Sequence, residues 1–305
     1  MTVRCKLFPW TMLVILLLAS CAPAATPAPV PTATPSPVPG TPTATPILYP
    51  LPVQSITRAN AGQGELLATL SIPEFNTSNV SQCSVAFSPD GRLLAGACDL
   101  TTVGVWDLHT GQLLFTLLDE RAHVVSLAFS PDSRTLATGQ FSGRLALWDM
   151  ATGELISEDA DTPTPVWDLS YSPDGNRLAT ARFSCRYRAG ATDVPGMALW
   201  DLADGVLLWD AAADECLLSV DYHPSGNFIA FGTSRYDGVY IMDAATGEML
   251  TNLRINAPVG DVAFSPDGMA LASGSDDDLL RLWDMTDYAL IGEMEGHSGY
   301  VHGVA

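Results

Sequence analysis

The sequence predicts an all-β protein made of small four-stranded antiparallel sheets that stand around a common axis. Two short units recur along the chain with nearly the same spacing. The stretches between them are strand-length apolar runs without helical periodicity. A repeat of about 42 residues with this content favours one sheet per copy.

The first recurring unit is a turn of the type FSPDG. Its copies are Phe87–Gly91, Phe129–Ser133, Tyr171–Gly175, Tyr222–Gly226 and Phe264–Gly268. Successive prolines are 42, 42, 51 and 42 residues apart. Because proline fixes φ and glycine accepts positive φ, each copy favours a tight turn between two strands.

The second unit ends a strand and usually contains Trp-Asp. Its copies begin at Val105, Leu147, Leu199, Ile241 and Leu282. Their aspartates are 42, 52, 42 and 41 residues apart, so both markers share one period. In the last full copy we expect strands at 259–264, 269–275, 279–284 and 288–294, joined by turns.

These two markers together resemble the WD-repeat β-propeller family. The resemblance covers about residues 64–305 and implies a propeller of four-stranded blades, in which the Trp-Asp units are structural and the tryptophans pack between blades. The residues concerned are Trp106, Asp107, Trp148, Asp149, Trp200, Asp201, Trp283 and Asp284. Met242 replaces the tryptophan in the fourth copy.

The chain departs from the family pattern in its polar residues. The family's Gly-His pair occurs in register only at Gly296-His297, because His123 lies three positions away from the matching place. The turn aspartate of the pattern matches Asp277, but Ser142 stands at that place in the second copy. We therefore expect incomplete polar networks inside the blades, with apolar packing holding the sheets together.

Both ends of the repeat region carry partial units. Gly64–Leu70 (GELLATL) matches two fourth strands but follows no earlier strand, and Gly296–Ala305 begins a sixth copy. We therefore expect five complete blades plus partial strands at both ends, an incomplete ring, and a C-terminally truncated chain.

Residues 1–20 read as a secretory signal. Arg4 and Lys6 precede the apolar run Thr11–Ala19, which is about half of the ~20 residues that a membrane-spanning helix needs. Leu18–Cys21 resembles the lipobox of bacterial lipoproteins, which implies cleavage before Cys21 and lipid attachment to it. The alternative is an ordinary signal followed by an incidental cysteine.

A Pro-, Thr- and Ala-rich tether follows at residues 21–63. It lacks apolar periodicity and so cannot build a packed core. Proline favours extended polyproline II, which suits a stalk between membrane and propeller. The expected location is therefore membrane-anchored, on the periplasmic or cell-surface side.

The formal net charge is −20, and Lys6 is the only lysine. Such an acidic surface repels phosphate backbones, which argues against nucleic acid as a partner. The charge is otherwise explained by solubility.

The cysteines after Cys21 suggest disulfides, because an exported protein meets an oxidising compartment. We expect the pairs Cys83–Cys98 and Cys185–Cys216, with buried free thiols as the alternative. Neither CxxC nor paired histidines accompany them, so no metal site is expected.

An insertion at Arg182–Pro195 lengthens the third copy. It contains Arg182, Phe183, Arg186, Tyr187 and Arg188, residue types that favour protein interfaces. We hypothesise that these five residues bind a partner protein. The alternative is that the arginines pair with the protein's own carboxylates.

The sequence favours a non-catalytic scaffold that binds other proteins, without a cofactor. It contains no GxSxG, HExxH or phosphate-binding glycine loop, and Asp276–Asp278 lacks the spacing of a calcium loop. Alternatives are a propeller enzyme or small-ligand receptor that uses the central channel, or a sensor domain of a larger protein. Asp168, Asp221 and Asp261 are the ionisable candidates on the predicted first strands.

Overall fold

The computed structural model describes residues 84–97, 101–118, 123–159, 164–183, 196–213 and 216–305. All regular elements in these ranges are β-strands. Within the same ranges there is no helix with the length and apolar character to cross a bilayer. The predicted signal, tether and strand at 64–70 lie outside the described residues.

Twenty strands form five sheets, named blades 1 to 5 in chain order. Blade 1 contains β1 (Ser84–Phe87), β2 (Leu93–Ala97), β3 (Thr102–Asp107) and β4 (Leu113–Leu118). Blade 2 contains β5 (Val124–Phe129), β6 (Thr135–Gln140), β7 (Leu145–Asp149) and β8 (Leu155–Asp159). Blade 3 contains β9 (Val166–Tyr171), β10 (Arg177–Arg182), β11 (Gly196–Asp201) and β12 (Val206–Ala212). Blade 4 contains β13 (Leu217–Tyr222), β14 (Phe228–Thr233), β15 (Val239–Asp243) and β16 (Met249–Leu253). Blade 5 contains β17 (Val259–Phe264), β18 (Ala270–Ser275), β19 (Leu280–Asp284) and β20 (Leu290–Met294).

The predicted fold class is confirmed. In every sheet the strands follow one another in chain order and pair antiparallel. The strand expected at 259–264 coincides with β17, and the other three expected strands of that copy start one or two residues before β18, β19 and β20.

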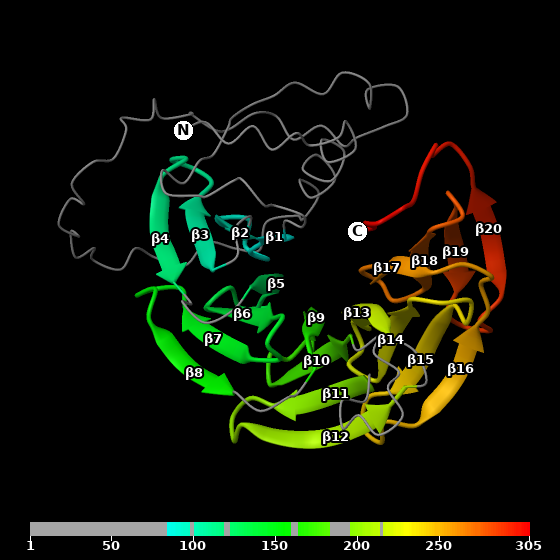
Figure 1. Cartoon of the computed structure of the whole chain (residues 1–305), viewed down its shortest axis with the longest axis horizontal. Coiled ribbons are helices and arrows are strands. Elements are labelled where there is room, and N and C mark those ends of the chain that lie inside the picture. The colour runs from blue at the N-terminus through cyan, green and yellow to red at the C-terminus, as the bar shows by residue number, and fades with distance from the viewer. Residues whose placement is uncertain (1–83, 98–100, 119–122, 160–163, 184–195, 214–215) are drawn as a thin grey trace.

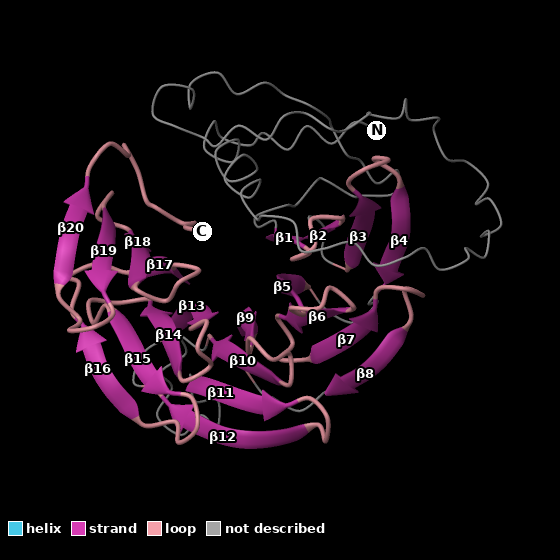
Figure 2. Cartoon of the chain, turned by 180° about the vertical axis from the view of Figure 1, so that it is seen from behind, coloured by secondary structure: helices cyan, strands magenta, loops and turns pink. Residues whose placement is uncertain are grey.

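The blades stand side by side around a central axis, with the first strand of each blade innermost (Figure 1). The first strands contact one another in the order β1, β5, β9, β13, β17. Seen from either side, the ring is open between β1 and the C-terminal segment (Figure 2). The prediction of five four-stranded blades in an unclosed ring is therefore confirmed.

The segment after β20 turns back onto blade 5. The Val301 N–H donates to the Ser275 carbonyl at 3.1 Å, and Val301 is buried. Val301 packs so closely against Gly274 that a side chain there would clash with it. Val259 packs in the same way against Gly232 one blade earlier. The segment thus takes the place of a following first strand, as the partial sixth copy predicts, although it is not assigned as a strand.

Each FSPDG turn is closed by its serine and aspartate. In blade 1 the Ser88 hydroxyl donates to the Asp90 carboxylate at 2.6 Å and accepts the Leu93 N–H at 2.8 Å. Gly91 adopts φ of 72°, the left-handed conformation that glycine accepts without strain. In blade 4 a histidine takes the serine's place, and His223 Nδ1 meets the Ser225 hydroxyl at 2.8 Å.

The Trp-Asp unit fixes the next turn and marks an irregularity in the sheet. In blade 2 the Asp149 carboxylate accepts the N–H groups of Ala151 and Thr152 at 2.7 and 2.9 Å. At Trp148 the pairing of β7 with β8 shifts by one residue, and a shift at the matching place occurs in all five blades. The aspartate therefore acts as a turn cap, which is a structural role.

The shift is a β-bulge in each outer strand, and the bulged residue is an exposed aliphatic one in all five blades. The bulged residues are Leu114, Ile156, Leu208, Leu250 and Ile291, which are 43–56% exposed. Bulges interrupt the row of free N–H and C=O groups that an edge strand offers. The bulge therefore protects each blade's outer edge from pairing with another strand.

The hydrophobic core consists of clusters between blades. Four clusters of buried side chains join blades 1 and 2, 2 and 3, 3 and 4, and 4 and 5. Trp148, Trp200 and Trp283 each belong to the cluster that joins their blade to the preceding one. Met242 packs in the same way in blade 4. Trp106 of blade 1 is also buried.

The polar networks inside the blades differ, as the sequence predicts. In blade 5 the Trp283 indole donates to the Ser273 hydroxyl at 3.0 Å, and Arg281 pairs with Asp277 and Glu293 at 2.7 Å. In blade 3 the buried Trp200 indole nitrogen has no partner among the described residues. The expectation of incomplete networks is thus confirmed in blade 3.

Truncating one core aromatic should reveal how much these clusters contribute. Phe231 on β14 is fully buried between blades 3 and 4. Phe231→Ala should lower the free energy of unfolding by about 3–5 kcal/mol, because it leaves a cavity in a close-packed interface. Urea denaturation followed by tryptophan fluorescence measures the effect. The control is Phe141→Ala, which removes a ring that is 52% exposed and should change stability by less than about 0.5 kcal/mol. Equal losses for the two variants would contradict a core located between the blades.

Candidate functional site

Three aspartates on the innermost strands connect consecutive blades. Oδ2 of each accepts a backbone N–H from the next innermost segment, in the pairs Asp168–Val220 (2.8 Å), Asp221–Phe264 (2.7 Å) and Asp261–Val304 (2.9 Å). Oδ1 of each accepts the N–H of the residue that follows it, at 2.9 Å. Each carboxylate therefore bridges two backbones.

A serine provides a second connection between blades 3 and 4. The Ser170 hydroxyl accepts the Tyr222 N–H at 3.0 Å and lies 3.4 Å from Asp221 Oδ1. The matching position is alanine in blades 1, 2 and 5. Blade 2 makes a longer connection of this kind to blade 3, because the Ser126 hydroxyl donates to the Val166 carbonyl at 3.5 Å.

Burial raises the pKa values of these three carboxyl groups. It raises the pKa of Asp168 to about 7 and that of Asp221 to about 6, although the N–H donors act in the opposite direction. It also raises the pKa of Asp261 well above its usual value, and the nearby charge of Asp168 adds to the effect. Loss of hydration therefore outweighs the hydrogen bonds at each site.

Raised pKa values often mark acid–base catalysts, but the geometry here indicates a structural role. Both oxygens of each carboxylate already accept a backbone N–H. A catalytic base needs an oxygen directed at a substrate proton. Within the described ranges no group of three His, Cys, Asp or Glu side chains is arranged to hold a metal ion.

The start of the lengthened loop in blade 3 carries a stacked aromatic pair. The rings of Trp167 and Phe183 lie 4.5 Å apart at an interplanar angle of 26°. Trp167 occupies a bulge in β9, where the pairing with β10 shifts by one residue. A bulge redirects a side chain, so the alternation of the strand alone does not predict this contact.

Arg182, one of the five predicted partner-binding residues, is buried. Its guanidinium pairs with the Asp210 carboxylate on β12 of the same blade. This contact is the local pairing that the sequence left open as an alternative. Phe183 stacks on Trp167 as described above. Arg186, Tyr187 and Arg188 lie outside the described residues.

Cys216 forms a disulfide, and its partner lies outside the described residues. The predicted partner Cys185 and the predicted pair Cys83–Cys98 are also outside those residues, as is Cys21. The pairings and the lipidation therefore remain predictions.

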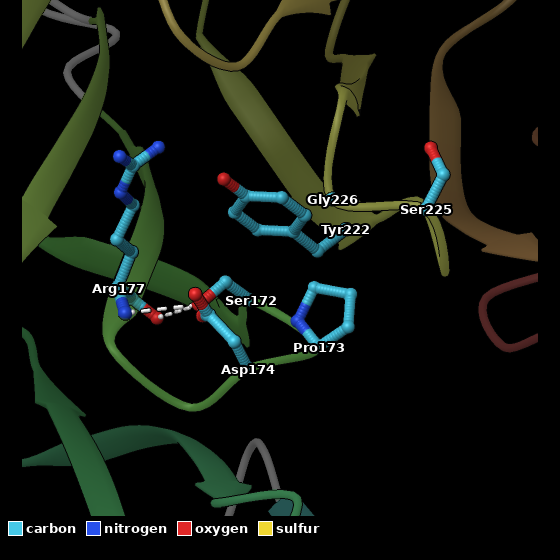
Figure 3. Close-up of a pocket in the computed structure, with 7 residues that line it drawn as sticks. All are labelled: Ser172, Pro173, Asp174, Arg177, Tyr222, Ser225 and Gly226. Carbon is cyan, nitrogen blue, oxygen red and sulfur yellow. Dashed lines mark hydrogen bonds between the residues drawn. The ribbon is translucent and has the colours of Figure 1, made fainter.

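A hollow of about 180 Å³ opens on the turn face between blades 3 and 4 (Figure 3). Its lining combines the FSPDG-type turns of both blades with two larger side chains, Arg177 and Tyr222. The Arg177 guanidinium and the Tyr222 hydroxyl point toward one another on one side of it (Figure 3). The sequence alone does not predict this pair, and its one signal is an arginine at a place where the other copies have uncharged residues.

Comparisons with known proteins identify the repeat. The family model for the WD domain, G-beta repeat, matches residues 64–107, 111–149, 156–186 and 247–284. Echinoderm microtubule-associated protein-like 1 of Mus musculus is 31% identical over 110 residues, which are 34% of this chain and 13% of that protein. Echinoderm microtubule-associated protein-like 4 of Xenopus laevis is 30% identical over 112 residues, 34% of this chain and 12% of that protein. The chain thus matches only about an eighth of the length of these relatives.

The three aspartates of the innermost strands, Asp168, Asp221 and Asp261, should make the fold more stable in mild acid. Because their pKa values are raised above the unfolded value near 3.9, the native state holds more protons than the unfolded state between about pH 4 and 7. Stability should therefore fall as pH rises through this window. We expect the melting temperature to be a few degrees higher at pH 5.5 than at pH 8.

Calorimetry of three proteins tests this prediction. Asp168→Asn/Asp221→Asn imitates the protonated acids, so its melting temperature should depend less on pH than that of the wild type. Asp284→Asn changes a partly buried turn aspartate whose pKa is lowered by hydrogen bonds from Thr286, and it should keep the wild-type dependence. A wild-type melting temperature that rises from pH 5.5 to pH 8 would show that these groups do not act in this way.

Proposed function

Because the chain carries WD40 repeats folded as the blades of a β-propeller, we propose that it is a non-catalytic protein-interaction scaffold anchored outside the cytoplasm by lipid on Cys21. The central observation is that Asp168, Asp221 and Asp261 each bind a backbone N–H of the next innermost segment. These aspartates thereby make the centre of the propeller rigid, and we assign partner recognition to the loops.

The lengthened loop of blade 3 is the strongest candidate for recognition. Its first two residues are fixed in place, since Arg182 is ion-paired with Asp210 and Phe183 is stacked on Trp167. Rigid support lowers the entropy that a loop loses when it binds. The remaining interface-type residues of the insertion, Arg186, Tyr187 and Arg188, then serve as the partner contacts.

The proposed location follows from the N-terminal sequence. Several acyl chains together hold a protein stably at a membrane, since each buried methylene contributes ~0.8 kcal/mol. The Pro-rich tether would then hold the propeller away from the bilayer surface. The net charge of −20 also disfavours direct contact with anionic headgroups.

Replacing Cys21 should abolish the membrane attachment. In bacteria fed tritiated palmitate, the wild-type protein should carry label and sediment with membranes. Cys21→Ala should carry no label and should leave the membrane fraction after cleavage or remain as an unlabelled precursor. Cys5→Ala changes the other N-terminal cysteine and should keep the label. Label retained by Cys21→Ala would contradict the proposed anchor.

Changes in the loop should reduce partner recovery without affecting the fold. Arg186→Ala/Tyr187→Ala/Arg188→Ala should lose, at least tenfold, the proteins that the wild type recovers after cross-linking in cell envelopes. Arg182 is left intact because its removal would leave Asp210 unpaired. Arg134→Ala, at an arginine side chain that is 85% exposed on a turn of blade 2, is the control. Unchanged recovery by the triple variant, with an unchanged melting temperature, would exclude the loop as the binding site.

A further inference from the structure

The interfaces between consecutive blades share one structural position on the turn face. In each blade this position is the residue five places after the serine or histidine of the FSPDG-type turn. It lies beside the aromatic residue that begins the FSPDG-type turn of the next blade. The four pairs are Leu93 with Phe129, Thr135 with Tyr171, Arg177 with Tyr222, and Phe228 with Phe264.

Three of these four pairs contain no charged group. Leu93 and Phe129 belong to one buried apolar cluster. The Thr135 and Tyr171 hydroxyls are hydrogen-bonded at 3.1 Å. Between blades 4 and 5, Phe228 and Phe264 both pack against the His223 ring, with ring centroids 5.3 and 4.8 Å from its centroid.

The pair at blades 3 and 4 is different because it contains a cation, whose charge and hydrogen bond act on the Tyr222 hydroxyl. In the described part of the chain no carboxylate lies within 4.0 Å of the Arg177 guanidinium, whereas Arg144, Arg182 and Arg281 are all ion-paired. Asp174, on the same turn, interacts with the charge of Arg177 at longer range, and its carboxylate accepts the Ser172 hydroxyl at 2.6 Å and the Asn176 N–H at 3.1 Å.

The other hydroxyl groups of the hollow are also engaged. Ser172 binds within its own turn, and Ser225 meets His223 Nδ1 at 2.8 Å. The remaining donors of the lining are the Arg177 guanidinium and the Tyr222 hydroxyl, which point toward one another at one side of the hollow (Figure 3). Pro173 and the Tyr222 ring supply apolar walls beside them.

We propose that this hollow binds a carboxylate of a protein partner, either a glutamate or aspartate side chain or a C-terminal carboxylate. The inference rests on the proposed scaffold function and assigns it a second contact point. A guanidinium pairs with the two oxygens of a carboxylate in a bidentate manner, and the phenol adds a third hydrogen bond. A volume of about 180 Å³ leaves room for a short side chain. The Asp174 carboxylate at the edge disfavours a doubly charged phosphate.

Nuclear magnetic resonance titration of the purified full-length protein tests the hollow directly. The reporter is the arginine Nε–Hε spectrum, with the Arg177 signal assigned by its loss in Arg177→Gln. The probes are N-acetylglutamate amide, N-acetylglycine, the uncharged N-acetylglutamine amide and inorganic phosphate. We expect saturable shifts of the Arg177 signal with at least one carboxylate probe and none with the glutamine probe. The better of the two carboxylate probes then distinguishes a side chain from a chain terminus.

Two variants and a control link the shifts to the proposed pair. Tyr222→Phe keeps the buried ring and should weaken binding a few-fold, while Arg177→Gln should weaken it at least tenfold, as followed by the neighbouring backbone amides. Arg134→Gln, on the neighbouring turn, should change nothing. Equal shifts with glutamate and glutamine probes, or a response to phosphate alone, would overturn the proposal.

Partner recovery separates this inference from the proposed function. If the carboxylate probe binds but no envelope protein is recovered by any variant, the scaffold function fails and the hollow stands only as a carboxylate site. If partners are recovered equally by wild type and Arg177→Gln, the scaffold stands and the partner contact at the hollow is overturned. Loss of recovery in Arg177→Gln, with Arg134→Gln unaffected, supports both.

Discussion

The whole structure depends on apolar packing between neighbouring sheets. Each blade has two faces and only four short strands, so it cannot bury either face alone. All four hydrophobic clusters join residues from two consecutive blades. A blade is therefore stable only where its neighbour covers it, and the curved arrangement follows from repeating one interface.

Polar contacts then fix how neighbouring blades align. Apolar packing is not directional, whereas a carboxylate that binds one N–H in its own strand and one in the next sets their register. Asp168 and Asp221 do this at a cost, because burial raises their pKa values to about 7 and about 6. Since hydration is lost while two donors are gained at each group, the bridges contribute more to specificity than to net stability.

Turn chemistry is local, and the parts of the fold that follow from it could be predicted. Proline, aspartate and glycine in FSPDG fix a turn from five residues, and the recurrence of that turn predicts the number of sheets. The β-bulge at Trp167 could not be predicted, because it depends on how β9 pairs with β10. The roles of Asp221 and Arg177 likewise depend on which atoms the next blade presents, 40 or more residues further along the chain. Arg182 shows the same limit, since only the fold brings Asp210 to it.

Repetition explains how a site can arise in this architecture without weakening it. The turn-face position occupied by Arg177 lies at the end of a blade interface, and its residue type differs among the five blades. Leu93 and Phe228 use that position for packing and Thr135 for one hydrogen bond, so each closes its own interface. Arginine at the same position neither packs fully nor finds a carboxylate, and it leaves an open hollow beside a tyrosine hydroxyl. In a chain with a net charge of −20, the neighbouring acids lower the cost of holding such a cation unpaired. A single substitution in one of several equivalent interfaces is thus sufficient to convert a structural contact into a recognition site.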